Sequence, residues 1–163
     1  MYYVLVIVLS LFVIYYIDNR FNNNLFIKDV KNINVKEMLL CSFSFVIIVM
    51  LLYLLFNYFG LITITKLKSV FILRYFLSIV LTPIVEEYIF RYLPCKLINR
   101  KVMVIIIGSV LFTTLHNVTF YESIIVFVAS ILLYLMYVKT NRISNSIVSH
   151  GLWNLCIIIL SMV

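Results

Sequence analysis

Apolar stretches long enough to cross a lipid bilayer recur along the whole of this 163-residue chain. A membrane-spanning helix needs about 17–25 predominantly apolar residues, and stretches of roughly that kind fall at residues 1–17, 38–59, 70–93, 102–116, 123–138 and 143–163. Hydrophobic residues make up 65% of the chain and charged residues only 12%, whereas soluble domains average about 25% charged residues. We therefore predict an all-α fold, a polytopic transmembrane helix bundle of about six spans.

The spans form one integral membrane domain, residues 1–163, with no soluble part and no internal repeat. The first stretch lacks a basic leader and a small-residue cleavage site, so we interpret it as a retained anchor rather than a signal peptide. Residues 1–59 would supply two accessory spans. Residues 70–163 would form a core of four spans that carries the polar motifs described below.

Basic residues lie in the gaps between the apolar stretches, and their distribution predicts the orientation. The first, third and fifth gaps hold nine Lys and Arg residues, whereas the second and fourth hold only Lys66 and Lys68. By the positive-inside rule the odd gaps face the cytoplasm and both termini are extracytoplasmic. The net charge of +7 is thus spread over loops, which argues against nucleic-acid binding. A composition rich in Ile, Asn, Lys and Tyr indicates an AT-rich genome, so we expect a multi-pass protein of a bacterial cell membrane.

Two adjacent glutamates, Glu86 and Glu87, lie inside the third span. They stand eight and seven residues before Pro94, which places them roughly 10–12 Å inside the predicted end of the helix. An ionisable residue at membrane depth is a functional hypothesis by default. Arg91 lies four residues after Glu87 and can pair with it, whereas Glu86 points about 100° away. Pro83 should kink this helix and leave carbonyls near residue 79 without their usual donor.

The only two histidines of the sequence also fall in or at the end of apolar spans. His116 follows Phe112 by four residues in the fourth span, and His150 precedes Asn154 by four in the sixth, so each pair shares a helix face. A single intramembrane histidine is more often an interhelical hydrogen-bond partner than a catalyst. Clustering of both histidines with the glutamates favours a common site.

This set of side chains suits the attack of water on an amide. A desolvated glutamate can act as general base, a histidine can hold the water or protonate the leaving amine, and an asparagine amide can donate to the oxyanion. Glu86, His116 and His150 could equally hold zinc, although the sequence contains no HExxH motif. The three cysteines show no metal-ligand or disulfide spacing and are interpreted as free thiols. The cofactor therefore stays open between zinc and none.

The motifs Glu86-Glu87-x-x-x-Arg91, Phe112-x-x-x-His116 and His150-x-x-x-Asn154 occur in this order on spans three, four and six. Their order resembles the CPBP intramembrane proteases, a family of type II CAAX prenyl endopeptidases, Abi proteins and bacteriocin self-immunity proteins. The resemblance covers residues 70–163. It implies that Glu86 activates water with the help of His116, while His150 and Asn154 hold the substrate carbonyl and its oxyanion. The remaining motif residues would support the site: Glu87, Arg91 and Phe112. It leaves open whether the family is a metalloprotease.

One spacing argues against a simple arrangement of these residues. His116 lies some fifteen residues from the basic third gap, or roughly 22 Å along a straight helix, whereas Glu86 and His150 are nearer to the cytoplasmic end. The three side chains can meet only if the fourth helix is tilted, begins outside the bilayer core or packs with an offset.

The leading functional hypothesis is an intramembrane endopeptidase that cleaves a membrane-associated or precursor peptide. If the source is bacterial, signal-peptide remnants, pheromone precursors or bacteriocin-like peptides are better substrates than prenylated proteins. The alternative is a non-catalytic membrane immunity or scaffold protein of the same fold. A transporter that uses Glu86 as an ion site is disfavoured, because the charges cluster at one spot rather than along a path.

Overall fold

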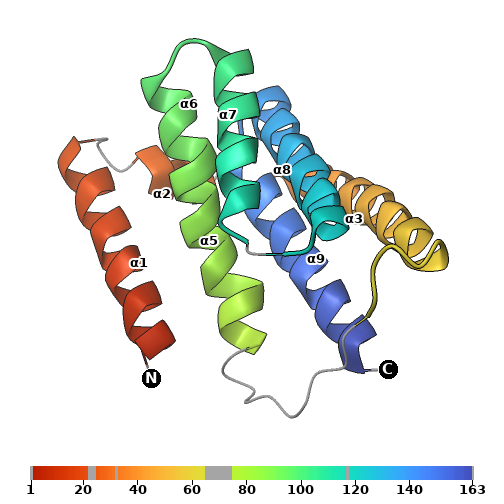
Figure 1. Cartoon of the computed structure of the whole chain (residues 1–163). Helices are drawn as coiled ribbons and strands as arrows, with labels where there is room; N and C mark the ends of the chain where they lie inside the picture. The colour runs from red at the N-terminus through yellow and green to blue at the C-terminus, as the bar shows by residue number, and fades with distance from the viewer. Residues whose placement is uncertain (1, 22–24, 32, 65–74, 117, 163) are drawn as a thin grey trace.

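The computed structural model describes residues 2–21, 25–31, 33–64, 75–116 and 118–162, and every regular element in these ranges is a helix (Figure 1). Lys66, Lys68 and the start of the predicted third span at residue 70 lie outside the described residues. Three of the described helices are long and apolar enough to cross a membrane: α3 (Val35–Tyr58), α8 (Phe120–Thr140) and α9 (Ile143–Met162). The prediction of an all-helical membrane protein is confirmed, and the count of six spans stays a prediction.

Helices α3, α8 and α9 pack against one another and form one half of the bundle. Phe45 and Val49 of α3 are buried against Ile125 and Leu133 of α8. The observed helices begin and end within three residues of the predicted second, fifth and sixth stretches. This agreement arises because a helix in lipid must keep all its backbone hydrogen bonds, so it continues for as long as the apolar stretch does.

The Glu86 helix, residues 77–97, runs through the other half of the bundle and changes its winding twice. A π-helical turn, η1 (Leu77–Leu81), precedes α5 (Thr82–Glu87), and a second one, η2 (Tyr88–Tyr92), precedes α6 (Leu93–Leu97). Each π turn is followed within two residues by a proline, Pro83 or Pro94. The predicted end of the third stretch, at residue 93, was wrong, because the helix continues through Pro94 to Leu97.

Two helices near the N-terminus lie beside the Glu86 helix. Helix α1 (Tyr2–Phe21) packs on α5, and the short α2 (Leu25–Lys31) packs on α9. The buried carboxylate of Asp18 accepts hydrogen bonds from the backbone N–H groups of Phe26 (3.0 Å) and Ile27 (3.2 Å), which caps the start of α2. The ring of Phe26 contacts the rings of Tyr88 and Tyr92 edge-on. These accessory helices therefore contribute to the packing around the Glu86 helix.

Helix α7 (Lys101–Thr114) is short, and His116 lies in the turn that follows it rather than on the helix as predicted. Figure 1 shows this turn level with the middle of α9. A helix of 14 residues rises about 20 Å, which is close to the length expected from the sequence.

Candidate active site

The Glu87 carboxylate lies at the centre of a buried polar cluster. Its Oε1 atom is 2.5 Å from Nη1 of Arg91 and 2.9 Å from Nδ1 of His150. Glu87 and Arg91 are fully buried, and His150 is almost so. The predicted pair between Glu87 and Arg91 is thus present, and the contact of Glu87 with His150 joins the Glu86 helix to α9. Because an ionised carboxylate only accepts hydrogen bonds, the Nδ1 atom of His150 carries a proton.

Arg91 is also held by side chains of α7 and α8. Its Nη2 donates to the Ser130 hydroxyl at 3.0 Å, and its guanidinium lies over the rings of Phe112 (4.5 Å) and Tyr134 (5.3 Å). A buried guanidinium requires such compensation, and cation–π contacts gain strength when they are desolvated. Arg91 therefore connects three helices, and Phe112 contributes a ring face to it.

Glu86 differs from its neighbour in both exposure and partners. Its side chain is 24% exposed, whereas that of Glu87 is fully buried. The Oε2 atom of Glu86 lies 3.5 Å from Nε2 of His150, and no hydrogen bond to it occurs in the described part of the chain. His150 thus faces one glutamate with each ring nitrogen, and the predicted asymmetry between the two acids is present in the structure.

His116 reaches this cluster through Phe112. The ring centroids of His116 and Phe112 are 4.3 Å apart, and those of Phe112 and His150 are 5.8 Å apart. The Nδ1 atom of His116 lies 2.7 Å from the Phe112 carbonyl oxygen. Since a carbonyl can only accept, Nδ1 carries a proton, and Nε2 of the neutral ring is then an acceptor. Both histidines contact the Phe112 ring. His116 thus lies near His150, although their positions along the predicted helices implied different depths.

Asn154 and Gly151 bring α9 against the first π turn. The Asn154 amide Nδ2 donates to the Ser78 carbonyl at 2.8 Å. A Cβ at Gly151 would lie 2.4 Å from the Ile79 carbonyl oxygen, so only glycine permits this approach. These carbonyls stand five and four residues before Pro83, which has no N–H to donate to either of them. The predicted carbonyls near residue 79 thus contact α9, and Asn154 retains a second amide N–H.

The carbonyl that Pro94 leaves without a backbone donor is also bonded by a side chain of a neighbouring helix. Pro94 has no N–H for the carbonyl of Phe90, four residues before it, and the hydroxyl of Tyr134 on α8 donates to that carbonyl. This bond explains why the helix passes through Pro94, since a side chain replaces the missing backbone donor. Gly108 of α7 lies against the Tyr134 ring, where a Cβ would overlap the hydroxyl.

The zinc alternative finds no support in the geometry. Among the described residues, which include Glu86, His116 and His150, no three His, Cys, Asp or Glu side chains are grouped so that they could hold a metal ion. Nδ1 of His116 is bonded to a backbone carbonyl and Nδ1 of His150 to Glu87, so only Nε2 of each ring could bind a metal ion. Because the described residues form no group of three ligands in this arrangement, no step below involves a metal.

Several residues of the cluster were not predicted from the sequence. Ser130 and Tyr134 lie in an apolar helix whose sequence carries no motif, and Ser78 takes part only through its backbone. The Ser130 hydroxyl bonds to the guanidinium of Arg91, 39 residues away, and the Tyr134 hydroxyl bonds to the Phe90 carbonyl, 44 residues away. The prolines were the one sequence signal for such contacts, because each leaves a backbone carbonyl that needs a donor from elsewhere.

The comparisons with known proteins identify a family. A family model described as type II CAAX prenyl endopeptidase Rce1-like matches residues 68–156. This range covers more than half of the chain and includes all three motifs, from Glu86 to Asn154. No curated protein and no solved structure matches the chain. The chain belongs to the Rce1-like family of type II CAAX prenyl endopeptidases, a family of membrane proteases.

Proposed function

We propose that this protein is an intramembrane endopeptidase in which Glu86 activates water to hydrolyse a peptide bond of a membrane-associated or precursor peptide. The observation that supports this proposal is the unequal environment of the two glutamates. Glu87 is fully buried and bonded through Oε1 to Arg91 and His150, whereas the Glu86 side chain is 24% exposed and has only His150, at 3.5 Å, as an ion-pair partner among the described residues. One carboxylate holds the site together, and the other is available to a water molecule.

In this proposal the water oxygen bonds to the substrate carbonyl carbon while Glu86 takes one of the water protons. His116 would accept a hydrogen bond from the water through Nε2. The negative charge that forms on the carbonyl oxygen would be stabilised by His150, if its ring carries both protons, and by the second amide N–H of Asn154. Glu86 then returns the proton to the departing amine as the C–N bond breaks. One water is consumed, and a carboxylic acid and an amine are formed.

A Glu86→Gln variant tests this assignment, because an amide keeps the size of the side chain and cannot accept the water proton. We expect peptide cleavage in proteoliposomes to fall by about 10²–10⁴-fold, with normal insertion and thermal stability. Glu122→Gln is the matched control, since glutamine also serves at the third position of the capping box formed with Thr119. It should cleave as the unaltered protein does. Unchanged cleavage by Glu86→Gln would exclude Glu86 as the base.

A further inference from the structure

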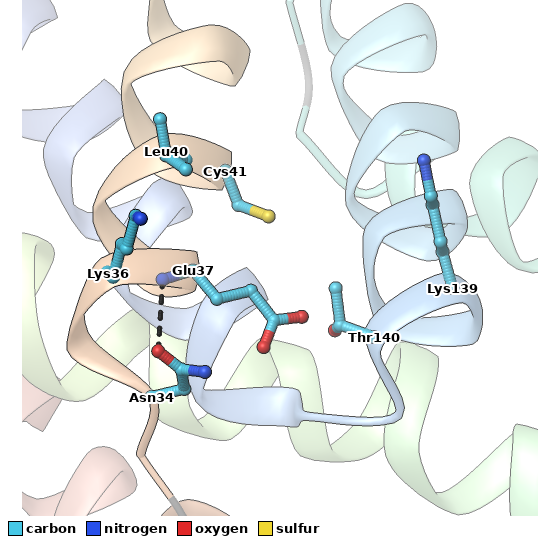
Figure 2. A pocket seen from close by; sticks show the side chains of 7 residues that line it. All are labelled: Asn34, Lys36, Glu37, Leu40, Cys41, Lys139 and Thr140. Carbon is cyan, nitrogen blue, oxygen red and sulfur yellow. Dashed lines mark hydrogen bonds between the residues drawn. The ribbon is translucent and has the colours of Figure 1, made fainter.

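A cleft lies between the start of α3 and the end of α8, away from the active site. It has a volume of about 490 Å³, and we call it the lysine cleft because Lys36 and Lys139 line it. Figure 2 shows these two side chains on opposite sides of the cleft, with Glu37 and Cys41 between them. Both lysines are exposed, and both lie near the end of a helix that is long enough to cross the membrane.

The lysine cleft carries an excess of positive charge. Its acid, Glu37, lies 3.5 Å from Arg142 in an ion pair. No carboxylate in the described ranges forms an ion pair with Lys36 or Lys139. In Figure 2 the Lys139 side chain runs back along α8, and its ammonium lies well away from the Glu37 carboxylate. Two ammonium groups are therefore left for an anion from outside the described chain.

An apolar groove continues from the lysine cleft along the same two helices. It has a volume of about 370 Å³, is lined by Ser44, Ile48 and Leu132 among others, and shares Cys41 and Lys139 with the lysine cleft. A phosphate or an acidic peptide would use only the charged part, and a neutral lipid only the apolar part. A molecule with an anionic head and a hydrocarbon tail uses both.

We propose that the lysine cleft and the apolar groove together bind one anionic phospholipid. Its phosphate lies between Lys36 and Lys139, and one acyl chain follows the groove between α3 and α8. Basic pockets between membrane helices recognise lipid headgroups in this manner, with the charge held near the membrane surface and the tail in the hydrocarbon. The proposal is independent of the proteolytic function and of the residues assigned to it.

The experiment is native mass spectrometry of the full-length protein in detergent with added phosphatidylglycerol or phosphatidylcholine. We expect one phosphatidylglycerol to be retained at activation energies that remove phosphatidylcholine. A Lys36→Gln/Lys139→Gln double variant should bind it at least tenfold more weakly, since each lysine near a membrane surface contributes about fivefold to affinity. A Lys28→Gln/Lys101→Gln variant, which loses the same charge at exposed positions outside the cleft, should bind it normally.

A second variant tests the tail. Ser44→Phe would place a ring in the apolar groove and leave both lysines unchanged. This variant should bind long-chain phosphatidylglycerol more weakly and bind dihexanoyl phosphatidylglycerol normally. Equal retention of phosphatidylglycerol and phosphatidylcholine, equal losses in the two lysine double variants, or glycerol phosphate binding as tightly as the lipid would each overturn the proposal. A thermal shift by phosphatidylglycerol that persists in the control variant and disappears in Lys36→Gln/Lys139→Gln would support it.

Discussion

Two adjacent carboxylates in one helix have different surroundings, and the difference arises from the geometry of the helix. Successive side chains point about 100° apart, so Glu87 is fully buried beside Arg91 while the Glu86 side chain lies on a less buried side of the helix. His150 lies between them and contacts both. The charge of either carboxylate therefore acts on the imidazole. This couples Glu87, which positions the site, to Glu86, the proposed base.

Arg91 should be the residue whose loss costs most stability. Arg91→Leu would leave the buried Glu87 without its cation, and removal of one partner of a buried pair costs about 3–5 kcal/mol. Ser130→Ala removes one hydrogen bond to Arg91 and should cost roughly 1–2 kcal/mol. Unfolding in detergent, followed by circular dichroism, measures both. Equal effects of the two substitutions would show that the ion pair contributes little beyond a single hydrogen bond.

Removal of metal ions should leave proteolysis unchanged, because the described site offers no group of three metal ligands. The measurement is the rate of peptide cleavage after dialysis against EDTA and 1,10-phenanthroline, with the metal content of the purified protein determined in parallel. A zinc protease treated alongside serves as the positive control for chelation. Loss of cleavage that added zinc restores would contradict the glutamate mechanism proposed above.

At the scale of the helices, the two prolines of the chain have a common structural role. Each follows a π turn, and each leaves carbonyls whose usual donor is missing. Asn154 of α9 donates beside Pro83, and Tyr134 of α8 donates beside Pro94. Glu86 and Glu87 lie between these two contacts. The segment that carries the proposed base is thus held at both ends by side chains from neighbouring helices.

A double-mutant cycle should reveal the contact at Pro94. Tyr134→Phe leaves the Phe90 carbonyl without its donor, and we expect a loss of about 1–3 kcal/mol. Pro94→Ala restores a backbone N–H four residues after Phe90, so the double variant should be more stable than the sum of the single effects predicts. Tyr121→Phe, at an exposed tyrosine, is the control and should have no effect. Additive losses in the cycle would contradict this account of the bond.

The sequence predicts the helices well and the site only in part. The long apolar stretches and the spacing of Glu87 and Arg91 each depend on local geometry, and both are confirmed. The fourth stretch was predicted at residues 102–116, and α7 ends two residues earlier, at Thr114. The turn at His116 depends on how the chain returns to α8, which no local pattern encodes. Tyr134 was missed for a related reason, since its partner lies 44 residues away. Contacts of this range become visible only once the helices are placed.

At the scale of the whole molecule, the two helices near the N-terminus pack against helices that carry the motifs, α1 on α5 and α2 on α9. The Asp18 carboxylate caps α2, and the cap holds Phe26 against Tyr88 and Tyr92, one and five residues after Glu87. The motifs alone gave no reason to connect residues 1–59 with the site. The packing indicates that α1 and α2 support the Glu86 helix.

Loss of the Phe26 ring should therefore weaken the whole protein. Phe26→Ala removes a buried ring and should cost about 3–5 kcal/mol, seen as a lower melting temperature in detergent. Phe12→Ala, at a phenylalanine of α1 that is 66% exposed, is the matched control and should have little effect. Similar melting temperatures for the two variants would show that α2 packs on the Glu86 helix without stabilising it.

The separation of the site residues along the chain also sets an order in time. Glu87 and Arg91 leave the ribosome within one helical turn of each other, so the pair can enter the bilayer through the translocon with its charges already matched. His150 is synthesised 63 residues after Glu87, and Glu86 meets its imidazole only when α9 docks. The site of a nascent chain is therefore incomplete while the chain contacts the insertion machinery. For the endopeptidase proposed above, this delay would prevent cleavage of the machinery that inserts the nascent chain.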